Sequence, residues 1–484
     1  MKHSRTLIAC LFLILCFLNA TGQLQQETFI LDEPGFPFIF ELNPGESQLI
    51  NRTYKGETIE KIIKLDSIRL FTEPNYWFSK PILQQNYYQA RVDLEISGKA
   101  VVLFHRPYQM PVTIDGLRIY IENIKQWDES ARIGKCGDMT KQVRIAVCME
   151  NEPWGPENIV FPINDYRWRS AVYYNTWSAL VPYNLLYYHR GEDYGAIPDR
   201  LEVVSPVDGK ITSSPLPDGD GRSNAISVES HDHFKWRLAH MNIETIRKEY
   251  PVGTEVKAGT VLAKTGMTWA GRKSQKDDPH LHVGLTLKGI KVASFPYLME
   301  AYLRKYPDQV LAIAGGYRFT ITGEPVELNA TRSITRDNLP LKSFKWNLSN
   351  GETVKAPQTT IIYNQPGLYS EELIVESNEG YQDRDFLYVR VFDPERGRNI
   401  ASGWTYYYPV RGIKPGMEVL FWNRLDKTTS DVNINFGDNS IWYLVSKETT
   451  HKYEKSGHYV VTLKSTGPEN EPVTLKMEII VEND

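Results

Sequence analysis

Short runs of alternating apolar and polar residues, separated by glycine- and proline-containing turns, make up most of this chain. In ARVDLEISGKAVVLFH, at 90–105, the apolar residues Val92, Leu94 and Ile96 alternate with polar ones, and Ser97-Gly98-Lys99 supplies a turn. This period of two is typical of β-hairpins. The 28 tyrosines and the many β-branched residues also favour strands. Long segments with a 3.6-residue period are scarce, so we expect a mostly β protein.

A chain of 484 residues allows about three domains at about 150 residues each. The sequence FPYLMEAYLRKY predicts one helix at 295–306. Changes of pattern divide the chain into a leader at 1–22, a β-rich accessory region of sandwich-like type at 23–175, a small antiparallel β domain at 176–306, and two β-sandwich repeats at 310–396 and 397–484.

The N-terminal sequence MKHSRTLIACLFLILCFLNATGQ indicates export. Lys2 and Arg5 precede an apolar run, and Ala20-Thr21-Gly22 forms a small-residue cleavage site, so residues 1–22 are predicted to be a signal peptide. Beyond it no stretch approaches the about 20 apolar residues that span a bilayer. We therefore expect a periplasmic, extracellular or cell-surface protein without a transmembrane segment.

The net charge and the cysteines narrow the expected partners. A formal charge of −4 offers no basic excess to displace counterions, so nucleic acid is not an expected partner. Cys136 and Cys148 remain after the leader is removed. Two cysteines twelve residues apart in an exported protein most often form a disulfide. A metal role is less favoured, because no histidine lies near them in the sequence. We expect a Cys136–Cys148 bridge.

Histidines gather in the middle of the chain. Six of the ten lie between positions 189 and 282, and two of these, His280 and His282, occupy the segment PHLHVGLTL at 279–287. Pro279 argues against a helix, and the apolar residues alternate as in a strand. Side chains two apart on a strand point to one face, about 6.5–7 Å apart along it. Alone, such a pair is also compatible with a strand surface that has no function.

Three further side chains join this pair. HRGEDYG, at 189–195, places His189 four residues before Asp193, and RLAHM, at 237–241, places His240 on an otherwise apolar strand. A polar turn and a core histidine bonded to backbone are the alternative interpretations of these segments. Their coincidence in one small β domain favours a shared metal site.

Zinc suits this set of donors. Zn²⁺ binds histidine nitrogens at about 2.0–2.1 Å and carboxylate oxygens at about 2.0–2.2 Å, and a catalytic site uses three protein ligands and one water. Bound zinc lowers the pKa of that water from about 15.7 to about 7. Five candidates for three ligand positions leave two histidines for proton transfer. The set therefore predicts an enzyme rather than a structural metal site.

These motifs, in this order, resemble the lysostaphin/LytM-type zinc metallopeptidases, and the phrases VVSPVDGKIT and VGTEVKAGTVLAKTG resemble the same family. The resemblance implies a small antiparallel β domain with a groove, whose usual substrates are peptide cross-links of peptidoglycan. It implies that His189, Asp193 and His282 bind one Zn²⁺ per chain. It also implies that His280 is the general base for a zinc-bound water and that His240 stabilises the tetrahedral oxyanion.

Two positions depart from that family. Leu238 stands where the family often has tyrosine, and Ser230 where it often has histidine. Both affect the groove rather than the metal ligands. We therefore expect a secreted or periplasmic zinc endopeptidase that cleaves stem peptides or cross-links of peptidoglycan. A zinc endopeptidase acting on an extracellular protein and a non-catalytic cell-wall binding or regulatory protein stay open as alternatives.

The last third of the chain resembles two polycystic-kidney-disease (PKD) domains, which are immunoglobulin-like sandwiches. INFGDNS, at 434–440, is close to that family's WxFGDG signature, whereas the first repeat has WNLSNGE at 346–352. Such domains usually act as spacers or binding modules. His451 and His458 in the second repeat are accordingly expected to be surface residues.

Overall fold

Strands dominate the computed structural model, which confirms the expectation of a mostly β protein. The predicted signal peptide at 1–22 lies outside the described residues. Among the described residues, no helix has both the length and the apolar character needed to cross a membrane. The structure describes residues 29–31, 35–77, 82–172, 174–181, 186–269, 272–273, 278–397, 400–426, 430–444 and 447–483.

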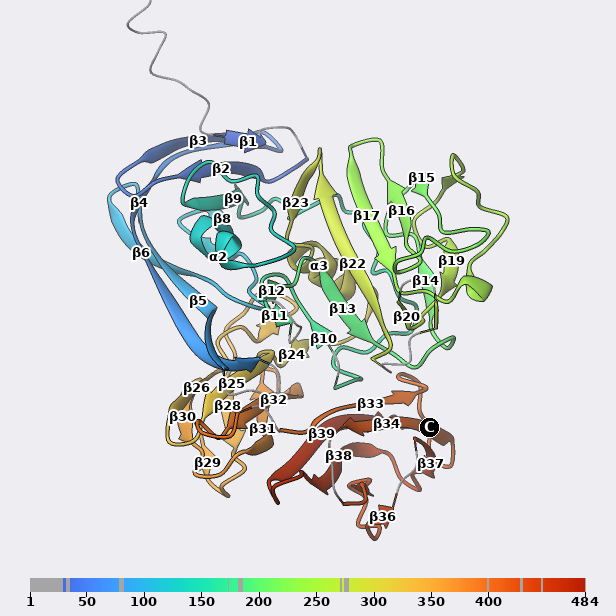
Figure 1. The fold of residues 1–484 in the computed structure, drawn as a ribbon. Coiled ribbons are helices and arrows are strands. Elements are labelled where there is room, and N and C mark those ends of the chain that lie inside the picture. Colours follow the sequence, from blue (N-terminus) through green and yellow to red (C-terminus); the bar gives the residue numbers. More distant parts are fainter. Residues whose placement is uncertain are drawn as a thin grey trace, which may run out of the picture.

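Two antiparallel sheets form the N-terminal region (Figure 1). The predicted hairpin at 90–105 is the β5–β6 pair, and Ser97 and Gly98 turn it with φ values of 47° and 85°. The short helix α2 (Lys125–Ser130) follows β8. One sheet has the order β1 (Phe29–Leu31), β2 (Phe38–Leu42), β9 (Val143–Met149), β8 (Leu117–Ile124), β7 (Val112–Ile114), and the other β3 (Ser47–Tyr54), β4 (Glu57–Trp77), β5 (Ile82–Ile96), β6 (Lys99–His105).

An eight-stranded sheet organises the central domain (Figure 1). The alternation read from PHLHVGLTL is strand β22 (His280–Leu287), which lies between β13 and β17 and also pairs with β23 (Ile290–Val292). The rest of the sheet has the order β10 (Tyr174–Asn175), β13 (Glu192–Gly195), β22, β17 (Phe234–Ala239), β16 (Ile226–Glu229), β15 (Gly209–Ser213), β18 (Glu255–Val256).

Short ladders and one helix complete this domain. The helix expected at 295–306 is α3 (Phe295–Lys305), whose buried face includes Leu298 and Tyr302. A single 3₁₀ turn, η1, spans Ile243–Thr245. The ladders pair β11 (Leu180–Val181) with β12 (Tyr187–Tyr188), β14 (Glu202–Val204) with β19 (Val261–Lys264), and β20 (Thr268–Trp269) with β21 (Arg272–Lys273).

The N-terminal region and the central domain share one hydrophobic core. Phe36 stacks on Phe234, with ring centroids 4.7 Å apart. Glu122 of β8 accepts a hydrogen bond at its carbonyl from Trp177 Nε1 at 3.0 Å and another at its carboxylate from the Ala293 amide. The accessory region is therefore docked onto the central domain by buried contacts.

Two sandwiches follow α3 (Figure 1). Strands β31 and β39 pair in parallel at Leu368 and Val473, so one nine-stranded sheet continues through both repeats. Its strands are β25 (Tyr317–Ile321), β32 (Gln382–Phe392), β31 (Gly367–Glu376), β39 (Pro472–Val481), β38 (Gly457–Thr466), β35 (Asn433–Asn435) and β36 (Tyr443–Leu444), with β28 (Ser343–Asn347) and β29 (Thr353–Val354) off this path. The remaining strands are β24 (Val310–Leu311) with β27 (Ile334–Thr335), β26 (Pro325–Asn329) with β30 (Gln358–Ile362), and β33 (Ser402–Tyr408) with β34 (Glu418–Asp426) and β37 (Glu448–Lys452).

The two histidines of the second sandwich differ from each other. His458 is half exposed beside Glu478, as expected. His451 stacks on Phe436 with ring centroids 3.9 Å apart, and its Nε2 lies 2.7 Å from Asp438 Oδ2. The expectation of a plain surface residue is wrong for His451, because its ring packs against the Phe436-Gly437-Asp438 turn.

The expected disulfide is also wrong, because Cys136 and Cys148 are both free thiols. Cys148 lies on the buried strand β9, where its Sγ is 3.7 Å from the Glu152 carbonyl oxygen. Cys136 lies on the loop after α2, where its amide donates to Asp128 Oδ1 at 2.9 Å. The two cysteines are not bonded although only twelve residues separate them in sequence. Cys148 is part of the sheet on β9, whereas Asp128 holds the loop that contains Cys136.

Candidate metal centre

Strand register brings the predicted ligands together. In the β13–β22 ladder Asp193 lies directly opposite His282, and Gly195 opposite His280. On the other side of β22, Ala239 of β17 is the partner of His282, so His240 follows at the end of β17. His189 enters from the loop between β12 and β13. All five predicted site residues thus meet at one end of three neighbouring strands.

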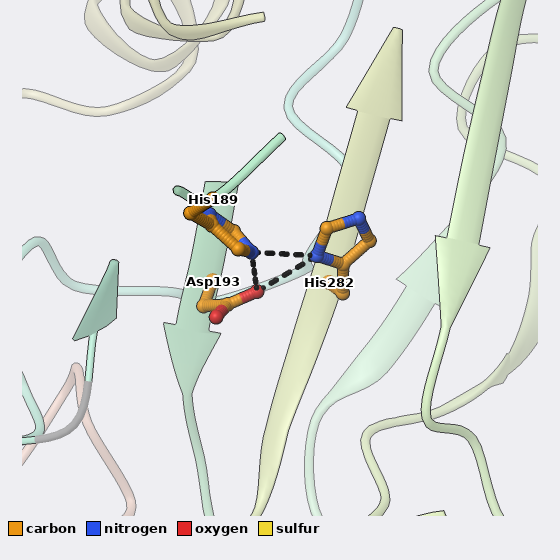
Figure 2. A group of neighbouring side chains, drawn as sticks. All are labelled: His189, Asp193 and His282. Carbon is orange, nitrogen blue, oxygen red and sulfur yellow. Dashed lines mark hydrogen bonds and ion pairs between the residues drawn. The ribbon is translucent and has the colours of Figure 1, made fainter. Parts of the chain in front are cut away.

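Three donor atoms converge in this place (Figure 2). Asp193 Oδ1 lies 3.0 Å from His189 Nε2 and 2.9 Å from His282 Nδ1. The two histidine nitrogens are themselves 3.0 Å apart. Hydrogen bonds alone satisfy such a triangle poorly, because the carboxylate has no proton and each neutral imidazole has a single N–H. Two imidazole nitrogens and one carboxylate oxygen are a donor set that suits zinc.

A glycine permits this close approach. A Cβ on Gly191 would lie 2.5 Å from the Val283 carbonyl oxygen and 2.9 Å from His282 Cε1. The loop between His189 and Asp193 can therefore lie against β22 only because residue 191 has no side chain.

Burial and neighbouring charges set the protonation states. Burial alone would raise the pKa of Asp193, but His189 and His280 lower it well below 3.8. Burial lowers the pKa of His282 to about 4, and burial with His280 and His282 lowers that of His240 well below 6.5. At neutral pH the Asp193 carboxylate is therefore charged and the His282 imidazole is neutral, as metal ligation requires, and the His240 imidazole is neutral as well.

The other two histidines stand beside the triangle. His280 Nε2 is 3.7 Å from Asp193 Oδ1, and the rings of His240 and His280 have centroids 4.5 Å apart. Backbone carbonyls hold both rings: His240 Nδ1 donates to the Thr268 oxygen at 2.9 Å, and His280 Nδ1 to the Asp278 oxygen at 2.6 Å. Each neutral ring therefore has Nε2 as its basic nitrogen.

A buried ion pair is formed by the residue next to His189, and sequence reasoning did not find it. The next residue, Arg190, is buried and lies with Nη2 2.5 Å from Asp128 Oδ1 and Nη1 3.2 Å from Ser178 Oγ. Asp128 belongs to α2 of the N-terminal region. The arginine next to the predicted ligand His189 could have indicated a buried ion pair, but its partner Asp128 lies 62 positions away in the sequence. Backbone carbonyls of Thr268 and Asp278 hold His240 and His280. A backbone carbonyl is present at every position, so no residue type in the sequence indicates this role.

Three parts of the chain match family models. These are Peptidase family M23 at 187–294 and the PKD domain at 309–391 and 404–478. A comparison with curated proteins gives no match.

Solved structures are similar to parts of the chain. A candidate glycyl-glycine endopeptidase, lytM, from Ruminococcus gnavus is 25% identical, covering 24% of this chain and 47% of its own length, with a TM-score of 0.21. This chain thus spans about half the length of that protein. Fibronectin(III)-like modules of Clostridium thermocellum CbhA are 12% identical over 36% of this chain and 94% of theirs, with a TM-score of 0.15. A bacterial ice-binding adhesin is 12% identical over 34% of this chain and 58% of its own, also with a TM-score of 0.15.

Proposed function

We propose that this protein, which contains a peptidase family M23 domain at 187–294 followed by two PKD domains, is an exported zinc endopeptidase that hydrolyses peptide bonds of peptidoglycan. The observation that carries the proposal is the convergence of His189, Asp193 and His282 beside two further histidines. The family match supports a peptide substrate. The apolar leader at 1–22 supports export.

The triangle of donor atoms would hold the metal. His189 Nε2, Asp193 Oδ1 and His282 Nδ1 are all within 3.0 Å of one another, and their side chains are mostly buried. Zinc bound there would supply a Lewis acid that makes water nucleophilic near neutral pH. Three protein ligands leave room for water or substrate, as catalytic rather than structural zinc sites do.

His280 and His240 would handle the protons. With Nδ1–H held by the Asp278 carbonyl, His280 Nε2 is positioned to take a proton from the attacking water and return it to the leaving amine. His240 Nε2 would accept a hydrogen bond from the same water, because its Nδ1–H is held by the Thr268 carbonyl. The second proton of that water, once passed to His240 Nε2, would let His240 donate a hydrogen bond to the developing oxyanion.

Digestion of purified muropeptides with the zinc-loaded protein tests this function. Mass spectrometry of the products is expected to show fragments from cleaved stem peptides or cross-links, and the His280→Ala variant serves as the inactive control. Denatured casein, run in parallel, tests the alternative of an extracellular protein substrate. Cleavage of casein alone would favour that alternative. Cleavage of neither substrate by a zinc-loaded, folded protein would favour the non-catalytic binding protein.

A further inference from the structure

A cavity lies where the N-terminal region, the central domain and the first PKD domain meet. Its lining includes residues of β5, β11 and β25, one strand from each of these three parts of the chain (Figure 1). None of the residues assigned to the metal centre lines it. The cavity is therefore separate from the candidate metal centre.

Arginines give this cavity its chemical character. Arg106, Arg318 and Arg332 line it together with two acids, Glu73 and Glu327. Arg318 has a partner, because its Nε lies 2.6 Å from Glu73 Oε2. Among the described residues, neither Arg106 nor Arg332 has a carboxylate oxygen within 4.0 Å. Neither of these two arginines therefore forms an ion pair with the described residues, although Glu327 also lines the cavity.

Arg106 is held only by neutral groups. It is 8% exposed, and it donates from Nε to Gln109 Oε1 at 2.8 Å and from Nη2 to Thr331 Oγ1 at 3.0 Å. Burial lowers the pKa of Arg106 to about 10, and the charge of Glu327 offsets only part of that effect. A buried cation with neutral partners is costly, so an anion entering the cavity would be stabilised.

Arg332 is in a similar position. Its guanidinium donates to the carbonyl oxygens of Pro107 at 3.0 Å, Asn329 at 3.1 Å and Ala314 at 3.3 Å. Its buried Nε has no hydrogen-bond partner among the described residues. Burial and the neighbouring arginines lower the pKa of Arg332 well below its usual value.

The balance of charge selects the kind of anion. Three guanidinium groups against two carboxylates leave the lining with one excess positive charge. Behind it, Arg169 and Asp385 add one charge of each sign, with Nε and Oδ2 3.5 Å apart. A single negative charge neutralises such a site, whereas a dianion would be repelled by Glu73 and Glu327. The planar fork of a guanidinium also matches a carboxylate.

We propose that this three-domain cavity binds one carboxylate group, supplied either by the C-terminal end of a peptide or by a small free acid. The site is connected to the metal centre through the main chain. Ser178 and Ala179 line the cavity, the Ser178 amide donates to the His189 carbonyl at 2.9 Å, and the His189 amide donates to the Ala179 carbonyl at 2.8 Å. A ligand in the cavity would therefore contact the segment that holds His189.

Calorimetric titration of the full zinc-loaded chain tests this proposal independently of its peptidase activity. The probes are acetyl-alanyl-alanine, its C-terminal amide, succinate monomethyl ester and inorganic phosphate. Binding of the peptide acid but not its amide identifies a peptide end, and binding of the monoester alone identifies a small acid. Because a hydrogen bond to a charged group contributes about 1.5–3 kcal/mol, Arg106→Gln is expected to weaken binding roughly 10- to 100-fold.

Matched variants separate the cavity from the metal as the place of binding. Gln89 lines the cavity on β5, so Gln89→Glu adds a repelling charge there while Gln89→Leu does not. Arg247→Gln removes an exposed arginine outside the lining and is expected to bind normally. Gln89→Glu also serves if Arg106→Gln does not fold. The proposal is overturned if no carboxylate binds, if binding is unchanged in both Arg106→Gln and Gln89→Glu, or if phosphate binds more tightly than the carboxylates.

Discussion

At the scale of single residues, the roles of His240 and His280 follow from which nitrogen is engaged. In both rings Nδ1 donates a hydrogen bond to a backbone carbonyl, at 2.9 Å for His240 and 2.6 Å for His280. In the neutral form of each ring Nε2 is therefore the basic nitrogen. This supports the proposal that they handle protons, with His189, Asp193 and His282 as the metal ligands.

Replacing either histidine is expected to separate metal binding from catalysis. His240→Ala and His280→Ala should keep most of their zinc and lose about 10²–10⁴-fold in rate, because each removes a positioned proton acceptor. The double variant should lose far less than the product of the two losses, since both residues act on one water. Peptide cleavage is measured beside zinc content and melting temperature. A folded, zinc-loaded variant that cleaves at the wild-type rate would remove that residue from the mechanism.

A buried histidine of the N-terminal region, His105, predicts how stability depends on pH. Burial lowers the pKa of His105 from 6.5 to about 4, and its Nδ1 is bonded to the Ile121 carbonyl at 2.9 Å. Between these values the unfolded chain binds a proton that the folded chain does not. The free energy of unfolding contributed by His105 therefore falls as pH drops from 6.5 towards 4, by about 1.4 kcal/mol per pH unit.

Urea unfolding of wild type and His105→Gln across this pH range measures the effect. The variant should show the shallower dependence of unfolding free energy on pH. Equal slopes for the two proteins would mean that His105 is protonated in the folded protein.

At the scale of elements, the β13–β22 ladder and the loop that enters it build the site. Asp193 is the direct partner of His282, and Gly191 lets the loop of His189 lie against β22. A Cβ on Gly191 would meet the Val283 carbonyl oxygen at 2.5 Å, which is backbone and cannot swing away. The loop would have to move, and His189 with it.

Gly191→Ala is therefore expected to weaken zinc binding by at least about tenfold, the equivalent of about 1.4 kcal/mol. Gly284→Ala is the matched control, because Gly284 lies on β22 together with His282. A Cβ on Gly284 would be 3.6 Å from His282 Nε2, which is an ordinary van der Waals contact. Competition with a chromogenic zinc chelator measures both. Equal affinity in the two variants would contradict the importance of this approach.

Local elements were largely predictable from sequence, because they depend on local pattern. The alternation around His280 and His282 predicted strand β22 and its shared face, and FPYLMEAYLRKY predicted α3. Both features follow from the periodicity of adjacent side chains. The family resemblance then indicated which site residues to bring together, and the structure does place all five at one end of the sheet.

At the scale of the whole molecule, the accessory region is joined to the M23 domain by buried contacts. Asp128 pairs with Arg190 beside the predicted ligand His189, and Phe36 stacks on Phe234. In a chain that begins at residue 176, Arg190 would lose its partner Asp128. Trp177 and Ala293 would lose the acceptor oxygens of Glu122. Loss of one partner of a buried ion pair alone costs about 3–5 kcal/mol.

Such a truncated chain is expected to aggregate or to melt at a much lower temperature than the full chain. Calorimetry and size-exclusion chromatography of the two proteins check this. A truncated chain that stays monomeric with an unchanged melting temperature would show that the region is only appended. The matched control is a chain that lacks residues 1–28 alone.

Contacts between distant segments were the part that sequence reasoning missed. The Asp128–Arg190 pair, the separation of Cys136 from Cys148 and the arginine-lined cavity all depend on how domains pack. Spacing along the chain carries no information about such packing. The cysteines show this most clearly, since the expected export favoured a bridge, whereas Cys148 lies on the buried strand β9 and both thiols are free.

The zinc content of the purified protein tests the central claim most directly. Mass spectrometry of the metals is expected to give about one zinc per wild-type chain, because a catalytic site has three protein ligands. His189→Ala, Asp193→Ala and His282→Ala should each lose it, whereas the exposed His233→Ala should keep it. One zinc per chain in all three ligand variants would contradict the assignment of His189, Asp193 and His282 as the metal centre.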